Sequence, residues 1–123
     1  MDVIIPMAGH SRRFKKAGYN LPKFLLDCGG KKMIEHVLDM FDESDTFHFI
    51  LNKDFENDLD LQDFLQKAYP KTFIYFIDSH EEGPTHTVMM ANLEINDDVE
   101  IIISYCDFTV SWDYDLFKRQ VLG

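Results

Sequence analysis

Short apolar runs alternate with amphipathic segments along the chain. Runs rich in Val, Ile and Phe predict buried strands at residues 2–7, 47–51, 73–77 and 99–104. Apolar positions at helical spacing predict helices at about residues 33–41, 61–68, 85–93 and 114–122. The Met89-Met90 pair on the third predicted helix is expected to fill the core. Because strands and helices alternate, we predict an α/β fold: a Rossmann-like, mostly parallel sheet with helices on both faces.

A polar segment at residues 8–22 separates the first predicted strand from the next elements. It contains glycine and shows no apolar periodicity, so it indicates a long loop. Loops of this length inside a compact domain are usually functional. In an open parallel sheet, ligands bind outside the carboxyl ends of the strands, which is where this loop begins.

Size and composition indicate one domain over residues 1–123. Apolar residues make up 46% and charged residues 28% of the 123, as in ordinary soluble globular proteins. The apolar runs are too short to span a membrane, and no signal peptide is evident. Cys28 and Cys106 lie far apart and indicate reduced thiols, so we expect a cytoplasmic protein.

The charge is distributed unevenly. The formal net charge of −10 argues against a nucleic-acid partner. Residues 1–38 nevertheless carry seven Lys and Arg against three acids, whereas the remainder carries five against nineteen. Cations concentrated in one segment of an acidic chain favour a local anionic ligand, with chance clustering on a solvated loop as the alternative.

The loop after the first strand has the chemistry to hold a polyphosphate. Its glycine lets the backbone approach a ligand closely, so that successive N–H groups can surround an anion. Its basic side chains add charge, and an arginine can bind two phosphate oxygens at once. The segment matches neither the P-loop nor the G-x-G-x-x-G pattern. The residues proposed to bind the ligand are Met7, Ala8, Gly9, His10, Ser11 and Arg12.

Two motifs together resemble the sugar-phosphate and phosphocholine-type nucleotidyltransferase family. That family carries a Gly-rich loop ending in Arg after strand one, followed by a Pro-Lys pair. Residues 8–14 (AGHSRRF) correspond to the loop, and Pro22-Lys23 to the pair. Residues 30–35 (GKKMIE) are similar to the family's Gly-Lys segment before a helix. Ser11 stands where the family usually has glycine, and its hydroxyl adds a donor.

The resemblance implies an enzyme that joins an NTP to a phosphorylated sugar or small alcohol and releases pyrophosphate. CTP or UTP is the favoured nucleotide. Arg13 would hold the β- and γ-phosphates, and Lys23 would sit on the α-phosphate, so both are predicted to be catalytic. A fixed cation there stabilises charge that develops in the transition state. No general base is needed, because a phosphomonoester acceptor has a second pKa of about 6.

The turn before the third predicted helix corresponds to the family's small-residue segment against the nucleobase. Small residues at a helix entrance leave room for a flat ring and offer hydrogen-bonding groups. An ordinary turn with Thr85 as N-cap predicts the same residues. The nucleotide-binding candidates here are Gly83, Pro84, Thr85 and Thr87.

Asp107 follows the fourth predicted strand and matches the family's metal-binding aspartate. Mg²⁺ takes few carboxylates plus substrate phosphates, so one aspartate suffices as a first ligand. Capping of the next turn is the alternative. Zinc is not expected: the five histidines show no zinc spacing, and residues 80–82 lack the second His of H-E-x-x-H.

Two other functions remain open. Enzymes of the family are about twice as long, so the fold is expected to be truncated and the acceptor pocket missing. A half-domain that binds NTP without turnover is therefore one alternative, and the exposed apolar surface of such a half predicts a homo-oligomer. The weaker alternative is a glycosyltransferase that uses a nucleotide sugar, because Asp113-Tyr114-Asp115 has the D-x-D form. The partners expected are small molecules, with neither nucleic acid nor membrane.

Overall fold

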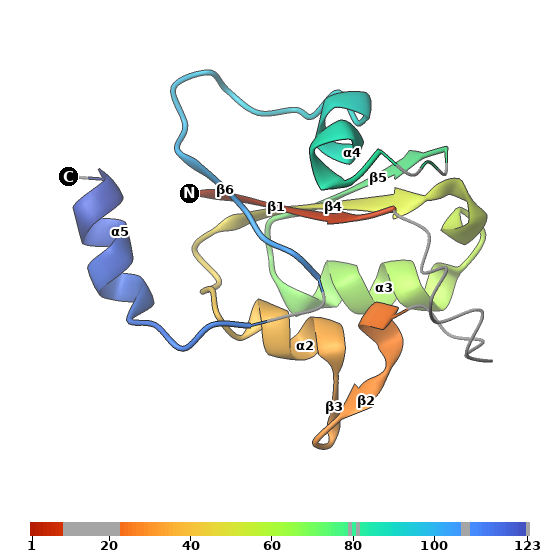
Figure 1. Cartoon of the computed structure of the whole chain (residues 1–123), viewed down its shortest axis with the longest axis horizontal. Coiled ribbons are helices and arrows are strands. Elements are labelled where there is room, and N and C mark those ends of the chain that lie inside the picture. Colours follow the sequence, from red (N-terminus) through yellow and green to blue (C-terminus); the bar gives the residue numbers. More distant parts are fainter. Residues whose placement is uncertain (9–22, 79, 81, 107–108, 123) are drawn as a thin grey trace.

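A four-stranded parallel sheet forms the centre of the molecule (Figure 1). The computed structural model describes residues 1–8, 23–78, 80, 82–106 and 109–122, residue 23 by its backbone alone. Neighbouring strands follow the order β5-β4-β1-β6, and all three pairings are parallel. The strands are β1 (Asp2–Met7), β4 (Thr46–Asn52), β5 (Thr72–Ile77) and β6 (Ile101–Ile103). The predicted strands and their parallel arrangement are confirmed.

Helices cover both faces of this sheet. Figure 1 shows α2 and α3 against one face and α4 against the other, while α5 stands to one side. The α-helices are α2 (Met33–Leu38), α3 (Leu59–Ala68), α4 (Pro84–Met90) and α5 (Tyr114–Leu122). The short elements are the 3₁₀ turns η1 (Lys23–Leu25) and η2 (Lys53–Phe55) and the strands β2 (Asp27–Cys28) and β3 (Lys31–Lys32). Among the helices described, none has the length and apolar character needed to cross a membrane.

The side-chain period of the strands divides the core into two layers. In β4, Phe47, Phe49 and Leu51 pack with α2 and α3, while Ile50 packs with Ile4 of β1 on the α4 side. Residues 3–7 of β1 are all buried, as expected of a central parallel strand with helices on both faces. The sheet therefore holds the end of β1 rigidly at the middle of the fold.

Local hydrogen bonds determine where the helices begin and end. Asp58 caps α3, because its carboxylate accepts the N–H of Leu61 at 3.0 Å. The helix predicted at 33–41 ends at Leu38, where Phe41 N–H turns back to the Leu38 carbonyl at 3.1 Å. The helix predicted to reach residue 93 ends at Met90, two residues before Asn92, whose φ is +50°.

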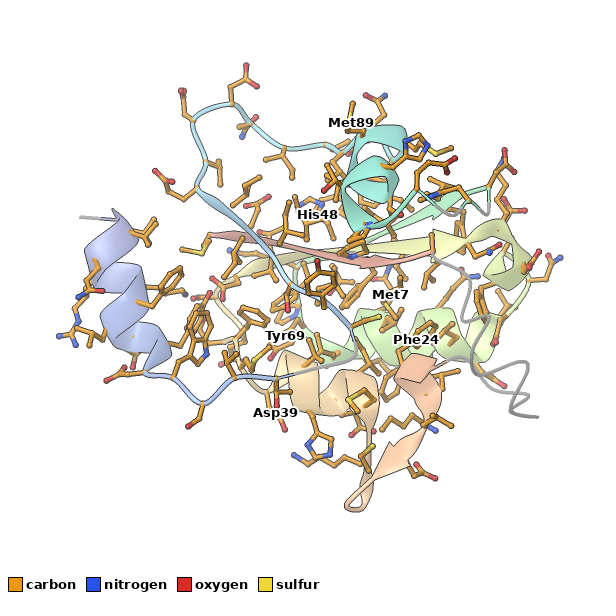
Figure 2. All side chains as sticks on the ribbon, in the orientation of Figure 1. Met7, Phe24, Asp39, His48, Tyr69 and Met89 are labelled. Carbon is orange, nitrogen blue, oxygen red and sulfur yellow. The ribbon has the colours of Figure 1, made fainter. Side chains whose placement is uncertain are left out.

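The prediction that the methionine pair of α4 fills the core is wrong. Met89 is 77% exposed and Met90 is 42% exposed, because the inward face of the short helix is taken by Thr87 and Val88. Figure 2 shows Met89 on the outer side of α4.

The turn between β2 and β3 requires glycine. Gly29 has φ of +61° and Gly30 has φ of +86°. Two consecutive positive φ angles match the tight hairpin turn whose twist suits antiparallel strands. This hairpin leads directly into α2, where the Glu35 carboxylate accepts the backbone N–H of Lys32 at 3.2 Å.

Candidate functional site

The carboxyl ends of the parallel strands define the edge where a ligand is expected. The segments of interest at this edge are the end of β1, η1, and the turn between β5 and α4 (Figure 1). Each carries residues that the sequence predicts to bind nucleotide.

Met7 and Ala8 lie at this edge with their side chains buried. Met7 is 4% exposed and belongs to the same buried cluster as Leu61 and Leu65 of α3, and Ala8 is fully buried in the cluster of Ile4 on the opposite face. Figure 2 shows Met7 between the sheet and α3. These two residues can therefore offer a ligand only N–H and carbonyl groups.

Most residues predicted to carry charge lie outside the described part of the chain. Lys23 begins η1, and only its backbone is described. The next residue, Phe24, is buried, and its ring lies 6.0 Å from that of Phe55. That anchor fixes the start of η1 next to the core. The remaining predicted residues, which are not described, are Gly9, His10, Ser11, Arg12, Arg13 and Asp107.

The turn from β5 into α4 has a backbone that glycine alone adopts without strain. Gly83 has φ of +90° and ψ of 178°, and it is the N-cap of α4. Pro84 occupies the first turn, which suits its fixed φ. The alternative with Thr85 as N-cap is therefore wrong. Thr85 is exposed at this turn and available to a ligand.

The Thr87 hydroxyl already contacts other groups of the protein. Its side chain is buried at 2% exposure, and its hydroxyl lies 2.8 Å from His80 Nε2 and 3.4 Å from the Gly83 carbonyl. Of the two threonines predicted to bind nucleotide here, Thr87 holds the turn against the helix, and only Thr85 faces outward.

The same turn brings together three side chains that the sequence did not connect. Ligand atoms of His80, Glu82 and His86 all lie within 4.8 Å of one another. The two imidazole rings are 4.6 Å apart between centroids. The only signal in the sequence is the spacing His-x-Glu-x₃-His across a glycine turn, which matches none of the zinc motifs considered.

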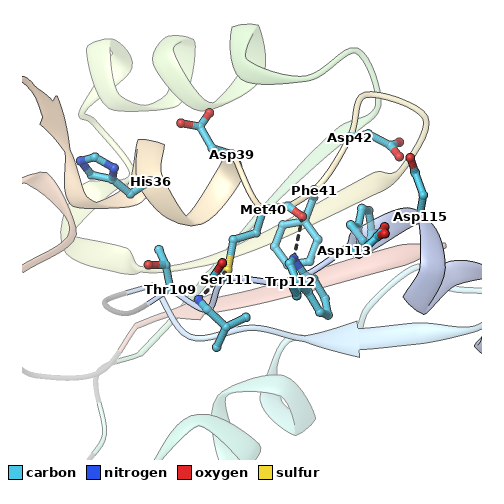
Figure 3. A pocket seen from close by; sticks show the side chains of 12 residues that line it. His36, Asp39, Met40, Phe41, Asp42, Thr109, Ser111, Trp112, Asp113 and Asp115 are labelled. Atoms are coloured by element: carbon cyan, nitrogen blue, oxygen red, sulfur yellow. Dashed lines mark hydrogen bonds between the residues drawn. The ribbon is translucent and has the colours of Figure 1, made fainter.

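A hollow of about 730 Å³ lies elsewhere, between α2 and residues 109–115 (Figure 3). Four aspartates line it, but three of them already have partners in the protein. Asp39 pairs with Lys31 at 2.6 Å and Asp42 with Lys118 at 3.0 Å, while Asp113 accepts the N–H of Leu116 at 3.0 Å. The negative charge makes this hollow unsuitable for a triphosphate.

Residues 112–114 have structural roles. Trp112 packs against Phe41, with ring centroids 6.0 Å apart, and its Nε1 donates to the Met40 carbonyl at 3.2 Å (Figure 3). Asp113 caps α5, and Tyr114 donates to Asp45 at 2.6 Å. Capping and packing thus account for two of the three residues in the D-x-D pattern.

Comparisons with known proteins identify the architecture. No family model matches the sequence, and no curated protein matches it significantly. Among solved structures, the nucleoside-diphosphate-sugar pyrophosphorylase from Vibrio cholerae RC9 matches 94% of this chain with a TM-score of 0.68 and 25% identity. The inositol-1-phosphate CTP transferase from T. maritima matches 86% of this chain with a TM-score of 0.62 and 12% identity.

The structural neighbours are nucleotidyltransferases. This finding confirms the resemblance inferred from the loop and the Pro-Lys pair, and with it the fold class. The chain spans about half the length of these structures, 52% of the pyrophosphorylase and 43% of the CTP transferase.

Proposed function

We propose that the chain is the nucleotide-binding part of a Mg²⁺-dependent nucleotidyltransferase, with CTP or UTP as the favoured nucleotide. The acceptor is a phosphorylated sugar or small alcohol, and pyrophosphate is released. The observation that carries this proposal is the match of 94% of the chain to a sugar-nucleotide pyrophosphorylase, at a TM-score of 0.68. The sequence motifs supporting it follow β1, at the edge where parallel sheets bind ligands.

In this proposal the charged loop binds and orients the triphosphate. Backbone N–H groups from Met7 to Arg12 surround the phosphates, and Arg13 holds the β- and γ-phosphates that leave. Lys23 neutralises charge on the α-phosphoryl group as the acceptor phosphate attacks, which stabilises the transition state more than the bound substrate. The buried anchor at Phe24, directly after Lys23, supports a preorganised position for this lysine.

The proposed base-binding surface is the turn at Gly83. With no side chain on Gly83 and with Thr85 exposed, a planar base can approach the backbone closely and meet a hydroxyl. Because Thr87 is already engaged with His80, its contribution is to hold this turn rather than to touch the base.

Asp107 is the proposed Mg²⁺ ligand. A carboxylate plus phosphate oxygens is a donor set that Mg²⁺ accepts. Bound there, the ion would neutralise charge on the phosphates during transfer. This residue follows Cys106 after β6, which pairs with the central strand β1.

A turnover assay tests the proposal. CTP, UTP, GTP and ATP are each mixed with Mg²⁺ and a panel of sugar 1-phosphates and phosphocholine, and pyrophosphate is measured. We expect one nucleotide and one acceptor class to release pyrophosphate, and Lys23→Ala to lower the rate by about 10²–10³-fold. Lys67→Ala is the matched control, because Lys67 lies on α3 in an exposed pair with Asp63. Equal rates for Lys23→Ala and wild type would refute the role of Lys23.

A non-catalytic NTP-binding half-domain is the second candidate. The observation favouring it is the coverage of only 52% and 43% of the two neighbours. Nucleotide binding without pyrophosphate release from any acceptor is the result that would support it.

We also propose a cytoplasmic protein that self-associates. In the described part of the sheet, β6 is an edge strand, and its Ile101 and Ile103 are 49% and 50% exposed. An apolar edge strand is a natural pairing surface for a second copy. Sedimentation should therefore find a dimer or larger species at micromolar concentration, and a clean monomer would contradict the proposal.

A further inference from the structure

The turn between β5 and α4 holds a cluster of metal-binding groups that the proposed nucleotidyl transfer does not use. His80 follows β5, Glu82 lies in the turn, and His86 lies on α4. Their ligand atoms all lie within 4.8 Å of one another. We propose that His80, Glu82 and His86 bind a divalent transition-metal ion of the zinc class, at a site separate from Asp107.

The donor set fits such an ion. Two imidazoles, which are borderline ligands, together with one carboxylate suit Zn²⁺ and its neighbours, whereas Mg²⁺ prefers oxygen atoms alone. Ligand atoms around a tetrahedral zinc lie about 3.3 Å apart, from bond lengths of about 2.0–2.1 Å. His80 Nδ1 and Glu82 Oε2 are already 3.5 Å apart. Only a small closure of the exposed Glu82 side chain and the half-buried His86 side chain is needed to complete the set.

The hydrogen bonds of His80 set its tautomer for metal binding. The Thr87 hydroxyl donates to the Gly83 carbonyl at 3.4 Å, so it accepts from His80 Nε2–H at 2.8 Å. Nδ1 then carries a lone pair, which accepts the backbone N–H of Glu82 at 3.2 Å. Metal-binding histidines typically donate their second ring N–H to a neighbouring acceptor, which orients the ring. Thr87 fills that role here.

Metal binding at Nδ1 would replace one hydrogen bond. The Nδ1 lone pair accepts the backbone N–H of Glu82 at 3.2 Å and lies 3.5 Å from the Glu82 carboxylate. An ion bound between Nδ1 and that carboxylate would take the place of this N–H. The side chain of His80 is only 8% exposed, while that of Glu82 is 64% exposed, so the cluster is rigid on one side and open to solvent on the other.

A bound ion would tie the turn to the helix. His80, Glu82 and His86 flank Gly83 on both sides, so coordination would fix the backbone at this glycine. Three protein ligands leave a fourth position open to water or to an oxygen of another molecule. The inference does not depend on nucleotide binding, because it concerns the metal alone.

The test is a calorimetric titration of the protein with ZnCl₂ and CoCl₂ in excess Mg²⁺, which occupies oxygen sites such as the one proposed at Asp107. We expect one Zn²⁺ per chain, and more than about tenfold weaker binding for His86→Ala and for Glu82→Gln. His36→Ala is the matched control, because His36 lies on α2 outside the cluster. Thr87→Val, which removes the partner of Nε2, should weaken binding by about tenfold.

Imidazole NMR of the wild-type protein locates the ion without any substitution. On adding Zn²⁺, the Nδ1 signal of His80 and a ring nitrogen of His86 should shift, while His80 Nε2 keeps its proton. Unchanged His80 and His86 signals would overturn the inference. So would equal zinc affinity in wild type, His86→Ala and Glu82→Gln, since neither side chain would then be a ligand.

Discussion

The two ends of the central sheet use polar groups in opposite ways. At the amino end, Asp45 is fully buried, and groups of the protein itself surround its carboxylate. Its carboxylate accepts from the Tyr114 hydroxyl at 2.6 Å and pairs with Lys118 at 2.8 Å and with the N-terminal amine at 3.6 Å. At the carboxyl end, Thr85 and Glu82 are exposed at a turn whose backbone favours glycine.

The polar groups at the amino end stabilise the fold, whereas those at the carboxyl end are placed to bind a ligand. Rings of Phe41, Trp112, Tyr114 and Phe117 surround the amino-end network, with neighbouring centroids 4.8–6.3 Å apart. A buried charge in such a place must be paired, so these residues hold α5 to the sheet. The carboxyl end has the exposed oxygen and nitrogen atoms that a nucleotide or a metal ion can bind. Substitutions at the two ends should therefore have separable effects.

The largest effect is expected from Asp45→Asn. The substitution keeps the shape but leaves the buried N-terminal amine without its counter-charge and Lys118 with Asp42 alone. We therefore expect a loss of about 3 kcal/mol in the free energy of unfolding. Urea denaturation measures the change. The matched control is Asp63→Asn, whose exposed pair with Lys67 should contribute close to zero. A loss for Asp45→Asn as small as that of the control would contradict the structural role of the network.

A smaller loss is expected from Gly83→Ala. A methyl group there meets no atom within 4 Å, so the cost comes from the backbone at φ of +90° and should be about 1–3 kcal/mol. The matched control is Gly30→Ala, at φ of +86° and also in open space. Both should lose stability, but only Gly83→Ala should also weaken nucleotide and zinc binding, as measured by calorimetry. Equal binding in the two variants would place the functional surface elsewhere.

The smallest effect is expected from alkaline pH at the amino end. Burial raises the pKa of Tyr114, and its hydrogen bond to Asp45 raises the pKa further. Burial likewise raises the pKa of Tyr69, to about 12. For Lys118, burial lowers the pKa, but hydrogen bonds to Asp45 and Asp42 outweigh it and the net change is upward.

These raised pKa values determine the sign of the pH dependence. The folded state holds the three protons more tightly, so their stabilisation is complete below the ordinary tyrosine pKa of about 10 and is lost above it. Urea midpoints measured from pH 8 to 11.5 should fall above pH 10, and less steeply in Tyr114→Phe. Tyr105→Phe, which alters a tyrosine 49% exposed, is the control and should follow wild type. A parallel decline in all three proteins would refute the assignment.

The strands were predictable from sequence, but several helix ends were not. Short apolar runs rich in Val and Ile, such as residues 2–7, favour strands, and a strand that is apolar throughout needs helices on both faces, as in a parallel sheet. The predicted ends at residues 41 and 93 were wrong because local turns end α2 and α4 early, at Leu38 and Met90. Apolar periodicity continues past a helix end when the following turn also packs on the core, as Phe41 does.

Long-range polar contacts lay beyond sequence reasoning. His48 lies in an apolar run, yet its ring nitrogens are 2.7 Å from Asp2 and 3.0 Å from the Tyr75 hydroxyl, partners 46 and 27 residues away. The buried network at Asp45 likewise joins residues from the two ends of the chain. Nothing local in the sequence pairs these groups.

The candidate site was predictable in part. The loop after β1 and the Pro-Lys pair can each be recognised from a few consecutive residues. The comparisons confirm the family resemblance that these motifs indicated. The roles of Arg13, Lys23 and Asp107 stay predictions. The grouping of His80, Glu82 and His86 was missed, because it depends on the reversal of the chain at Gly83.

The central claim is that the carboxyl end binds an NTP with Mg²⁺. The most direct measurement is a calorimetric titration with CTP, UTP, GTP and ATP, each with and without Mg²⁺, on wild type, Lys23→Ala and Asp107→Ala. We predict selective binding of CTP or UTP, weakened by both substitutions and strengthened by Mg²⁺ only where Asp107 is intact. Asp45→Asn, assayed where it is folded, should bind like wild type. Absence of binding by any NTP, or affinity unchanged in both variants, would contradict the claim.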